Sequence, residues 1–180
     1  MKTIKSILTL LVLTLAFTTT SCDNEPIDPA IDLSAGNGSS SVFTAKIDGS
    51  NFVADETIGD YTETAIGNQL IIGGLSSSGK TISFQIINPA IGTFPASMES
   101  TSLNLLQYYD ASIGATGGAF SSYNPITDSS IGTVTITSFD TTNNKVSGTF
   151  SFEAYNISNS TTKSITAGVF TNIEFDNQVD

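Results

Sequence analysis

From Val42 onward the chain alternates apolar and polar residues with a period of two, in short runs rich in Val, Ile, Thr, Phe and Tyr. Clusters of Gly, Asn, Asp and Ser separate these runs, as turns separate the strands of a sheet. The segment 102–109 also fits a helix through Leu103 and Leu106, but its two tyrosines and its surroundings favour a strand. The pattern predicts about nine strands, at 42–47, 50–54, 69–75, 80–87, 103–109, 118–123, 131–139, 145–155 and 164–175.

The first two predicted strands are joined by Asp48-Gly49, a strong signal for a two-residue hairpin turn. Such a turn sets Ala45 opposite Phe52. The apolar residues of both strands then fall on one face, so the turn chemistry and the hydrophobic pattern predict the same register.

Two later hairpins also have a predicted register. A five-residue loop at 76–80 places Ile72 opposite Phe84, with both side chains on the apolar face. In the last hairpin, a six-residue loop places Lys145 opposite Glu174 on the outer face. That pairing predicts an exposed ion pair worth roughly a few tenths of a kcal/mol.

Strands with one apolar face must bury that face against a second layer. The sequence therefore predicts an all-β domain at 42–180, an antiparallel β-sandwich of two sheets, with a β-barrel as the alternative. A domain of this length buries roughly two-thirds of its unfolded surface, so it needs no disulfide. The chain has a single cysteine, so the fold has to be held by its core.

The N-terminus, residues 1–21, has the pattern of a secretory signal peptide. Two lysines precede an apolar run at 7–17, which is shorter than the roughly 20 residues of a membrane span. Small residues at 18–21 then lead to Cys22. This arrangement resembles a bacterial lipoprotein signal, which implies cleavage before Cys22 and acylation of that residue. Ordinary cleavage after Ser21 is the alternative, and it would leave a free thiol on an exported chain.

Residues 22–41 follow as a segment rich in Asp, Pro, Gly and Ser, which is typical of a flexible tether. Asp23, Asn24 and Glu25, directly after the cysteine, resemble the acidic surface-export signals of Bacteroidota lipoproteins. The resemblance implies an outer-membrane lipoprotein displayed at the cell surface. The alternative is an anchor facing the periplasm, whose acidic linker is merely solvated.

Composition excludes several classes of function. The chain has no His, its six basic residues are all lysines, and its formal charge is −11. The absence of His excludes Ser-His-Asp triads and His-ligated metal sites, and the absence of Arg excludes bidentate anion clamps. So acidic a chain is not expected to bind nucleic acid, and no nucleotide-binding motif is present. No cofactor is expected. After cleavage, four lysines and 17 acidic residues leave a formal charge of −13.

Aromatic residues near the loop-rich middle of the chain are candidates for contacting a ligand. They are Tyr108, Tyr109 and Tyr123, with Phe120 nearby. Exposed aromatics at one end of a sandwich stack on sugar rings or contact peptides. The alternative is that these tyrosines cover the core with their hydroxyl groups in water.

Acidic residues between the second and third predicted strands form a weak candidate for a calcium site: Asp55, Glu56, Asp60 and Glu63. Calcium takes six to eight oxygen ligands and suits extracellular loops. The spacing of these four acidic residues does not match an EF-hand, and a solvated acidic loop is the alternative.

Asp140-Thr141-Thr142 matches the Asp-Ser/Thr-small pattern of protein O-glycosylation in Bacteroidota, which makes Thr141 a candidate for modification. The tripeptide falls in a predicted hairpin turn, where a glycan would be tolerated. Asp and Asn are also common turn residues for their own backbone-bonding chemistry.

An enzyme is not expected. Glu153 and Glu174 are predicted to point outward from strands and not into a cleft, where paired carboxylates would have to lie for glycoside hydrolysis. No GxSxG or SxxK motif is present.

Four segments together resemble a family of small Bacteroidota lipoproteins with a β-rich domain of unknown function: 43–52, 132–140, 145–152 and 165–170. The resemblance covers about 42–175 and implies a location and a fold but no catalytic residues. The sequence thus predicts a protein attached to the membrane by a lipid, with a non-catalytic binding or structural role and an unidentified glycan or protein ligand. A periplasm-facing accessory subunit of an envelope complex, and a carbohydrate-active or metal-dependent enzyme, are the alternatives.

Overall fold

The computed structural model describes residues 41–99, 102–115 and 117–179, which form an all-β domain. Cys22, the predicted signal peptide and nearly all of the predicted tether lie outside the described residues. Within them there is no α-helix, and no helix is long and apolar enough to cross a membrane. The strands are β1 Val42–Ile47, β2 Ser50–Val53, β3 Glu56–Thr64, β4 Gly67–Leu75, β5 Lys80–Ile87, β6 Gly92–Pro95, β7 Leu105–Asp110, β8 Ala119–Ser121, β9 Tyr123–Asn124, β10 Ser129–Ser130, β11 Gly132–Asp140, β12 Lys145–Asn156, β13 Thr161–Glu174 and β14 Asp176–Asn177, with a 3₁₀ turn, η2, at Ala111–Ile113.

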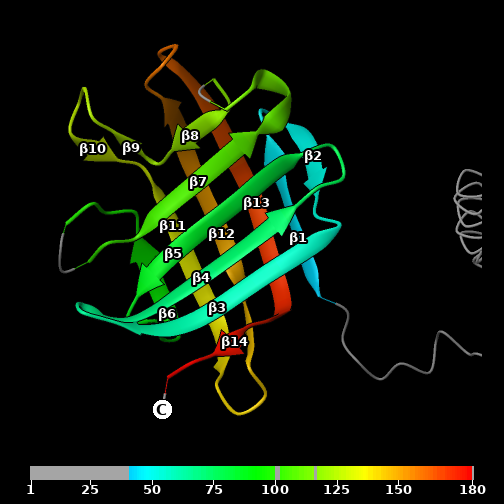
Figure 1. The fold of residues 1–180 in the computed structure, drawn as a ribbon, viewed down its shortest axis with the longest axis vertical. Helices are drawn as coiled ribbons and strands as arrows, with labels where there is room; N and C mark the ends of the chain where they lie inside the picture. The colour runs from blue at the N-terminus through cyan, green and yellow to red at the C-terminus, as the bar shows by residue number, and fades with distance from the viewer. Residues whose placement is uncertain (1–40, 100–101, 116, 180) are drawn as a thin grey trace, which may run out of the picture. The chain divides into compact units, whose positions relative to one another are not determined.

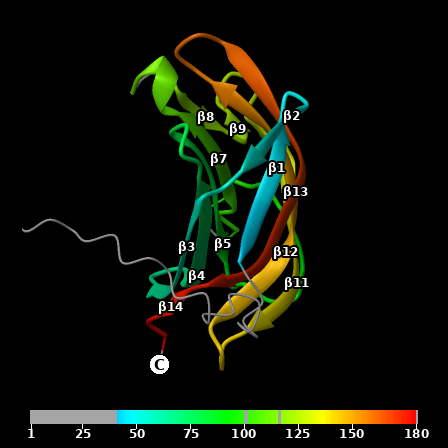
Figure 2. The ribbon, with the colours of Figure 1, turned by 90° about the vertical axis from the view of Figure 1, so that its right-hand side faces the viewer.

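Most strands belong to one sheet that curls back on itself. Its hydrogen-bonded order is β14-β3-β4-β5-β7-β8-β12-β13-β1-β2, with β11 pairing along residues 145–152 of β12, on the same edge as β8, and β6 beside β11. The two halves are joined where Ser121 of β8 pairs with Tyr155 of β12. Seen edge-on, β3, β4, β5 and β7 form one layer, and β1, β13, β12 and β11 form the other (Figure 2). A small second sheet, β9 with β10, projects from the same end as β8 (Figure 1).

The all-β prediction is confirmed. The two predicted layers are the halves of a single open sheet with the curvature of a half-barrel. Ala45 lies opposite Phe52, and Ile72 lies opposite Phe84, as the hairpin turns predicted. The segment predicted at 103–109 is indeed a strand, β7.

The core lies between the two layers and is rich in aromatic side chains. Phe84 of β5 packs against Phe150 of β12 and Phe170 of β13, with ring centroids 5.6 and 5.2 Å apart. Phe43 of β1 packs on Phe150 at 5.1 Å. Because these rings come from both layers, aromatic packing holds the two layers of the curled sheet together.

The acidic segment after β2 is a strand and not the predicted loop. β3 pairs with β4 along its whole length, from Glu56 opposite Leu75 to Thr64 opposite Gly67. Only Tyr61 of β3 is buried, because the strand lies near an edge of the sheet with one face in water. A strand with a single buried residue has too weak an apolar alternation to be recognised by period.

The last hairpin corrects one prediction and confirms another. Lys145 does pair with Glu174, and their Nζ and Oε1 atoms are 3.6 Å apart. The turn, however, has four residues and not six, because Asn156 already pairs with Thr161. Two register shifts along β12 and β13 account for the difference, each adding one residue to β13. Left-handed residues, Asn172 (φ 49°) and Ala167 (φ 50°), lie at these β-bulges.

Replacing Ala167 with Gly is expected to raise the free energy of unfolding by about 0.5–1 kcal/mol. Ala167 is exposed, so its methyl group contributes little packing, whereas its left-handed backbone is costly for any residue with a Cβ atom. Urea unfolding of both proteins measures the change. Thr166→Gly, at an exposed neighbour without a positive φ, is the control and should destabilise. A loss of stability in Ala167→Gly would contradict this account of the bulge.

Candidate functional site: a polar cleft at one end of the β domain

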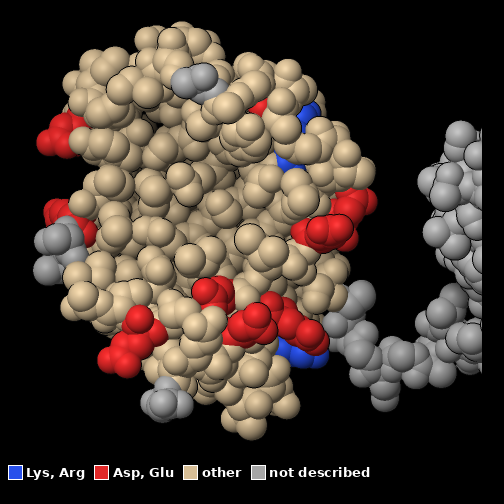
Figure 3. All heavy atoms as spheres, viewed as in Figure 1, with Lys and Arg blue, Asp and Glu red and all other residues tan. Residues whose placement is uncertain are grey.

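A cleft of about 480 Å³ opens where the two layers separate at one end of the domain. Its walls come from the β1–β2 turn and β2, the β4–β5 turn, the end of β7 and the start of β13. The lining carries three Asp, two Lys and several Ser side chains. Acidic atoms outnumber basic ones on the face shown in Figure 3, and two of the few basic groups visible there lie near each other at its upper right. Two of the four lysines among the described residues, Lys80 and Lys163, line this cleft.

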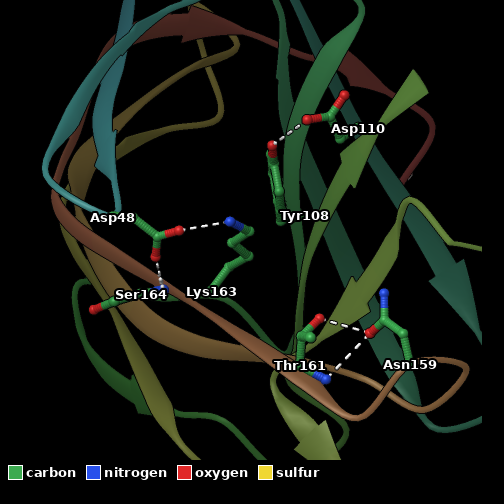
Figure 4. A network of polar contacts seen from close by, with 7 residues as sticks. All are labelled: Asp48, Tyr108, Asp110, Asn159, Thr161, Lys163 and Ser164. Carbon is green, nitrogen blue, oxygen red and sulfur yellow. Dashed lines mark hydrogen bonds and ion pairs between the residues drawn. The ribbon is translucent and has the colours of Figure 1, made fainter. Parts of the chain in front are cut away.

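Asp48 fixes one wall of the cleft to β13. Asp48 and Gly49 both have positive φ (49° and 82°), as a two-residue type I′ hairpin turn requires. The Asp48 backbone N–H donates to the Ser164 carbonyl (2.9 Å), and the Ser164 N–H donates to Asp48 Oδ1 (2.9 Å). Lys163 Nζ donates to Asp48 Oδ2 at 2.6 Å (Figure 4). The Lys163 hydrogen bond, followed by that from Ser164, lowers the pKa of the Asp48 carboxyl group.

Tyr108 and Asp110 form the facing wall, at the end of β7 (Figure 4). Tyr108 points inward, is 2% exposed, and packs on Phe120 with ring centroids 5.5 Å apart. Its hydroxyl donates to Asp110 Oδ2 (3.1 Å), while the Ser112 N–H (3.0 Å) and hydroxyl (2.6 Å) donate to Oδ1. Burial, aided by Asp110, raises the pKa of Tyr108, so its phenol stays a hydrogen-bond donor.

The pKa of Asp110 is lowered, chiefly by the hydrogen bond from the Ser112 side chain and against the effect of burial. Tyr108 and the charge of Lys80 add to the lowering. Asp110 is therefore ionised at neutral pH even though it is only 8% exposed.

Asp110→Asn is expected to destabilise the domain by about 1.5–3 kcal/mol at pH 7, the usual value of hydrogen bonds to a charged group. Because the pKa of Asp110 is lower when folded than when unfolded, its charge adds stability that is full above the ordinary pKa of 3.8. That stability is lost as the pH falls through the folded-state pKa. Urea unfolding at pH 7, 5 and 3 should show a gap between the two proteins that narrows only below about pH 4. Glu99→Gln, which removes an exposed carboxylate, is the control. A gap equally wide at pH 3 would contradict the assignment.

The β4–β5 turn forms the third side of the cleft. The Ser76 N–H donates to the Lys80 carbonyl (2.8 Å), Ser76 Oγ and Ser78 Oγ lie 2.8 Å apart, and the Ser77 N–H donates to Asp55 Oδ2. That bond lowers the pKa of Asp55. Lys80, at the start of β5, forms no ion pair and no side-chain hydrogen bond with the described residues. Three sides of the cleft are thus held by internal hydrogen bonds.

The three predicted ligand-contact tyrosines do not form one platform. Tyr108 lines the cleft but is buried, so its ring does not present a face to solvent. Tyr109 follows it on β7 and therefore points to the opposite face. Tyr123 lies by the small second sheet, where its hydroxyl donates to Asp128 Oδ1 (2.9 Å). It lines a separate, mainly apolar hollow of about 220 Å³ together with Phe120 and Tyr155.

The four acidic residues considered for calcium are divided between two places. Asp55 lines the cleft, whereas Glu56, Asp60 and Glu63 lie along β3. Asp60 accepts a hydrogen bond from Gln178 Nε2 (3.2 Å) and pairs with Asp176 of β14. In the part of the chain that the structure describes, no three acidic side chains are grouped as a metal ion would require.

Thr141 is exposed in the β11–β12 turn, where the sequence placed it. Asp140 accepts from the N–H groups of Thr142 (2.9 Å) and Asn143 (3.0 Å), so the Asp140 side chain orders the turn.

Modification of Thr141 stays a prediction. We expect the mature protein from its native host to carry a glycan mass that is lost in Thr141→Ala and retained in Thr161→Ala, an exposed threonine at the start of β13. Intact mass spectrometry measures this, and an unmodified wild-type mass would contradict it.

The cleft residues Asp48, Lys80, Asp110 and Lys163 were not among the candidate ligand-contact residues of the sequence. Only Asp48 carried a signal, as a turn residue. The other three are ordinary strand-end residues that come together through the curl of the sheet.

The comparison with known proteins finds a protein family that covers most of the β domain. The profile described as Domain of unknown function (DUF6252) matches residues 39–174, which include every strand of the cleft. No curated protein and no solved structure matches the chain.

Proposed function

We propose a non-catalytic binding function for this chain, which belongs to the family of the Domain of unknown function (DUF6252). In this proposal a lipidated Cys22 attaches the β domain to the outer membrane, and the domain binds a small polar ligand at the cell surface. The observation that carries the binding function is the cleft, a concave site of ordinary ligand size in which polar groups converge from four parts of the fold.

The charge states of the cleft carboxyl groups favour binding over general acid catalysis. General acid catalysis by a carboxyl group needs a raised pKa. The pKa values of Asp48, Asp55 and Asp110 are all lowered instead, each by hydrogen bonds that hold the cleft in shape. Groups that are ionised and fixed by internal bonds suit recognition, because they lose little freedom when a ligand binds.

The lipid anchor and surface display rest on the sequence. Cys22 follows an apolar run and small residues, and the acidic residues after it are the feature that favours the outer face. Several acyl chains give stable attachment, whereas one chain alone is marginal.

Metabolic labelling with radioactive palmitate tests the anchor. Wild-type protein in its native host should incorporate label and partition into detergent, and Cys22→Ser should do neither. Ser34→Ala, a conservative change in the predicted tether, is the control. An unlabelled wild type would overturn the anchor.

Protease treatment of intact cells tests surface display. Added protease should digest the protein on intact cells, whereas protection from protease would favour the periplasm-facing alternative.

A glycan panel tests the binding function. Full-length protein in detergent is applied to immobilised glycans, together with Ser78→Trp, which fills the cleft from its exposed serine turn, and Ser158→Trp, which changes an exposed turn serine elsewhere. We expect binding that Ser78→Trp abolishes and Ser158→Trp retains. Absence of binding by the wild type, or equal binding by both variants, would overturn a glycan-binding role for the cleft.

A further inference from the structure

The charged groups of the cleft differ in how far the protein already uses their hydrogen-bonding capacity. Both carboxylate oxygens of Asp48 and both of Asp110 already accept bonds from the protein, and Asp55 has one oxygen so engaged. The ammonium groups are less committed. Lys163 uses one bond to Asp48, whereas Lys80 Nζ forms no ion pair and no hydrogen bond with the described residues, although its charge acts on Asp110. A ligand that enters therefore meets ammonium donors that are almost all free, whereas the carboxylate oxygens are already partly used by bonds within the protein.

The charges of the cleft lining limit which anionic group a ligand can place beside the lysines. Three ionised Asp and two Lys line the cleft, a formal charge of −1. A monoanion held at Lys80 neutralises an ammonium group that lacks an ion pair, whereas a dianion such as a phosphate monoester adds repulsion from the three carboxylates. No Arg is present to form a bidentate phosphate clamp. A carboxylate is therefore the anion that best matches the site.

The rest of the lining suits hydroxyl groups. Ser50, Ser77 and Ser78 offer hydroxyls that both donate and accept, Asn51 offers an amide, and the second oxygen of Asp55 is an acceptor. Val53 is 61% exposed at the rim and gives an apolar contact for the C–H face of a ring. The cleft thus combines one unpaired cation with hydroxyl-binding groups and a small apolar patch.

We propose that the cleft binds a carboxylate-bearing sugar, a uronic acid residue, with its carboxylate on Lys80 Nζ and its hydroxyl groups on the β4–β5 serine turn and Asp55. This inference rests on the proposed binding function and specifies the ligand class of the same site.

Titration with two sugars that differ at one carbon tests the proposal. D-Glucuronate carries a carboxylate where D-glucose has a hydroxymethyl group. Each is added to full-length protein in detergent micelles, and binding is measured by calorimetry and by shifts of backbone amide resonances. Lys80→Gln removes the charge and keeps most of the side-chain length. Lys145→Gln removes a lysine that lies outside the cleft and pairs with Glu174.

Glucuronate should bind wild type and Lys145→Gln equally, shift the amides of 76–80, and bind Lys80→Gln at least about tenfold more weakly. Glucose should bind more weakly than glucuronate, and Lys80→Gln should not change its affinity. Unchanged spectra of Lys80→Gln away from residue 80 show that the fold is intact.

Three results would overturn the proposal: glucuronate fails to shift the cleft amides, Lys80→Gln binds it as tightly as wild type, or glucose 6-phosphate binds more tightly than glucuronate. If neutral glycans on the panel bind and Ser78→Trp abolishes that binding, the binding function stands while the acidic ligand fails. The two failures are thereby distinguished.

Discussion

Phe84→Ala should lower the free energy of unfolding by about 3–5 kcal/mol, the usual cost of removing a buried phenylalanine ring. Phe84 is 2% exposed and is the ring of the β5 layer that contacts Phe43, Phe150 and Phe170 of the other layer. Its removal leaves a cavity between two layers that are connected by short strand pairings, β8 with β12 and, after β13, β14 with β3. The facing rings lie on rigid strands, so they are poorly placed to move in and fill the space.

Urea unfolding followed by circular dichroism measures this loss. Phe84→Leu keeps most of the volume and should cost about 1–1.5 kcal/mol. Ile157→Ala truncates a side chain that is 66% exposed and should change stability by less than about 0.5 kcal/mol. A loss below about 1 kcal/mol in Phe84→Ala would contradict the central role of this ring between the layers.

Gly148→Ala should destabilise the domain by about 3 kcal/mol or more, the upper range for overpacking a core. Gly148 lies on β12 between β11 and β13, opposite Ile136 on one side and Phe170 on the other. The Phe170 ring lies over the glycine, so an added Cβ atom would be 2.5 Å from its Cζ atom and 2.1 Å from the Thr135 carbonyl oxygen. The oxygen belongs to a paired strand, so β11 would have to move away.

The same unfolding experiment measures the effect. Gly117→Ala is the matched control, because its new methyl group would meet only the Cγ2 atom of Ile113 at 3.0 Å and the Ile113 carbonyl oxygen at 3.3 Å, and a change within about 0.5 kcal/mol is expected. The double variant Gly148→Ala/Phe170→Leu has a smaller side chain over residue 148. It should therefore recover part of the stability that the single variant Gly148→Ala loses. Wild-type stability in Gly148→Ala would show that β11 and β12 are less closely paired than described.

The local parts of the fold followed from sequence. Asp48-Gly49 predicted both a turn and the pairing of Ala45 with Phe52, because a two-residue turn leaves a single register once the apolar face is known. In the last hairpin the same reasoning found the pairing of Lys145 with Glu174 but not the turn length. The bulges at Ala167 and Asn172 each add one residue to β13. The two added residues together keep the same face of β13 buried at both ends of the strand, so the apolar pattern does not reveal them, and the turn is two residues shorter than the pattern predicts.

The cleft could not be predicted in the same way. Lys163 and Asp48 are joined by an ion pair across 115 positions of the sequence, and Lys80 and Asp110 come from neighbouring strands. Each is a charged residue at a strand end, which is where charged residues ordinarily lie. Tyr108 illustrates the same limit: period two placed it on a strand, but its hydroxyl meets Asp110 only because both side chains point inward from β7.

The sequence alone determined what depends on neighbouring residues: an all-β domain, the turns, and the composition that excludes His and Arg chemistry. The tertiary structure decided what depends on the curl of the sheet. It made β3 a strand through pairing with β4, enclosed the aromatic core, and brought two lysines and three aspartates to one cleft. The physical reason is that hydrophobic periodicity specifies which face of a strand is buried, whereas the contacts at strand ends depend on how the two layers are placed relative to each other.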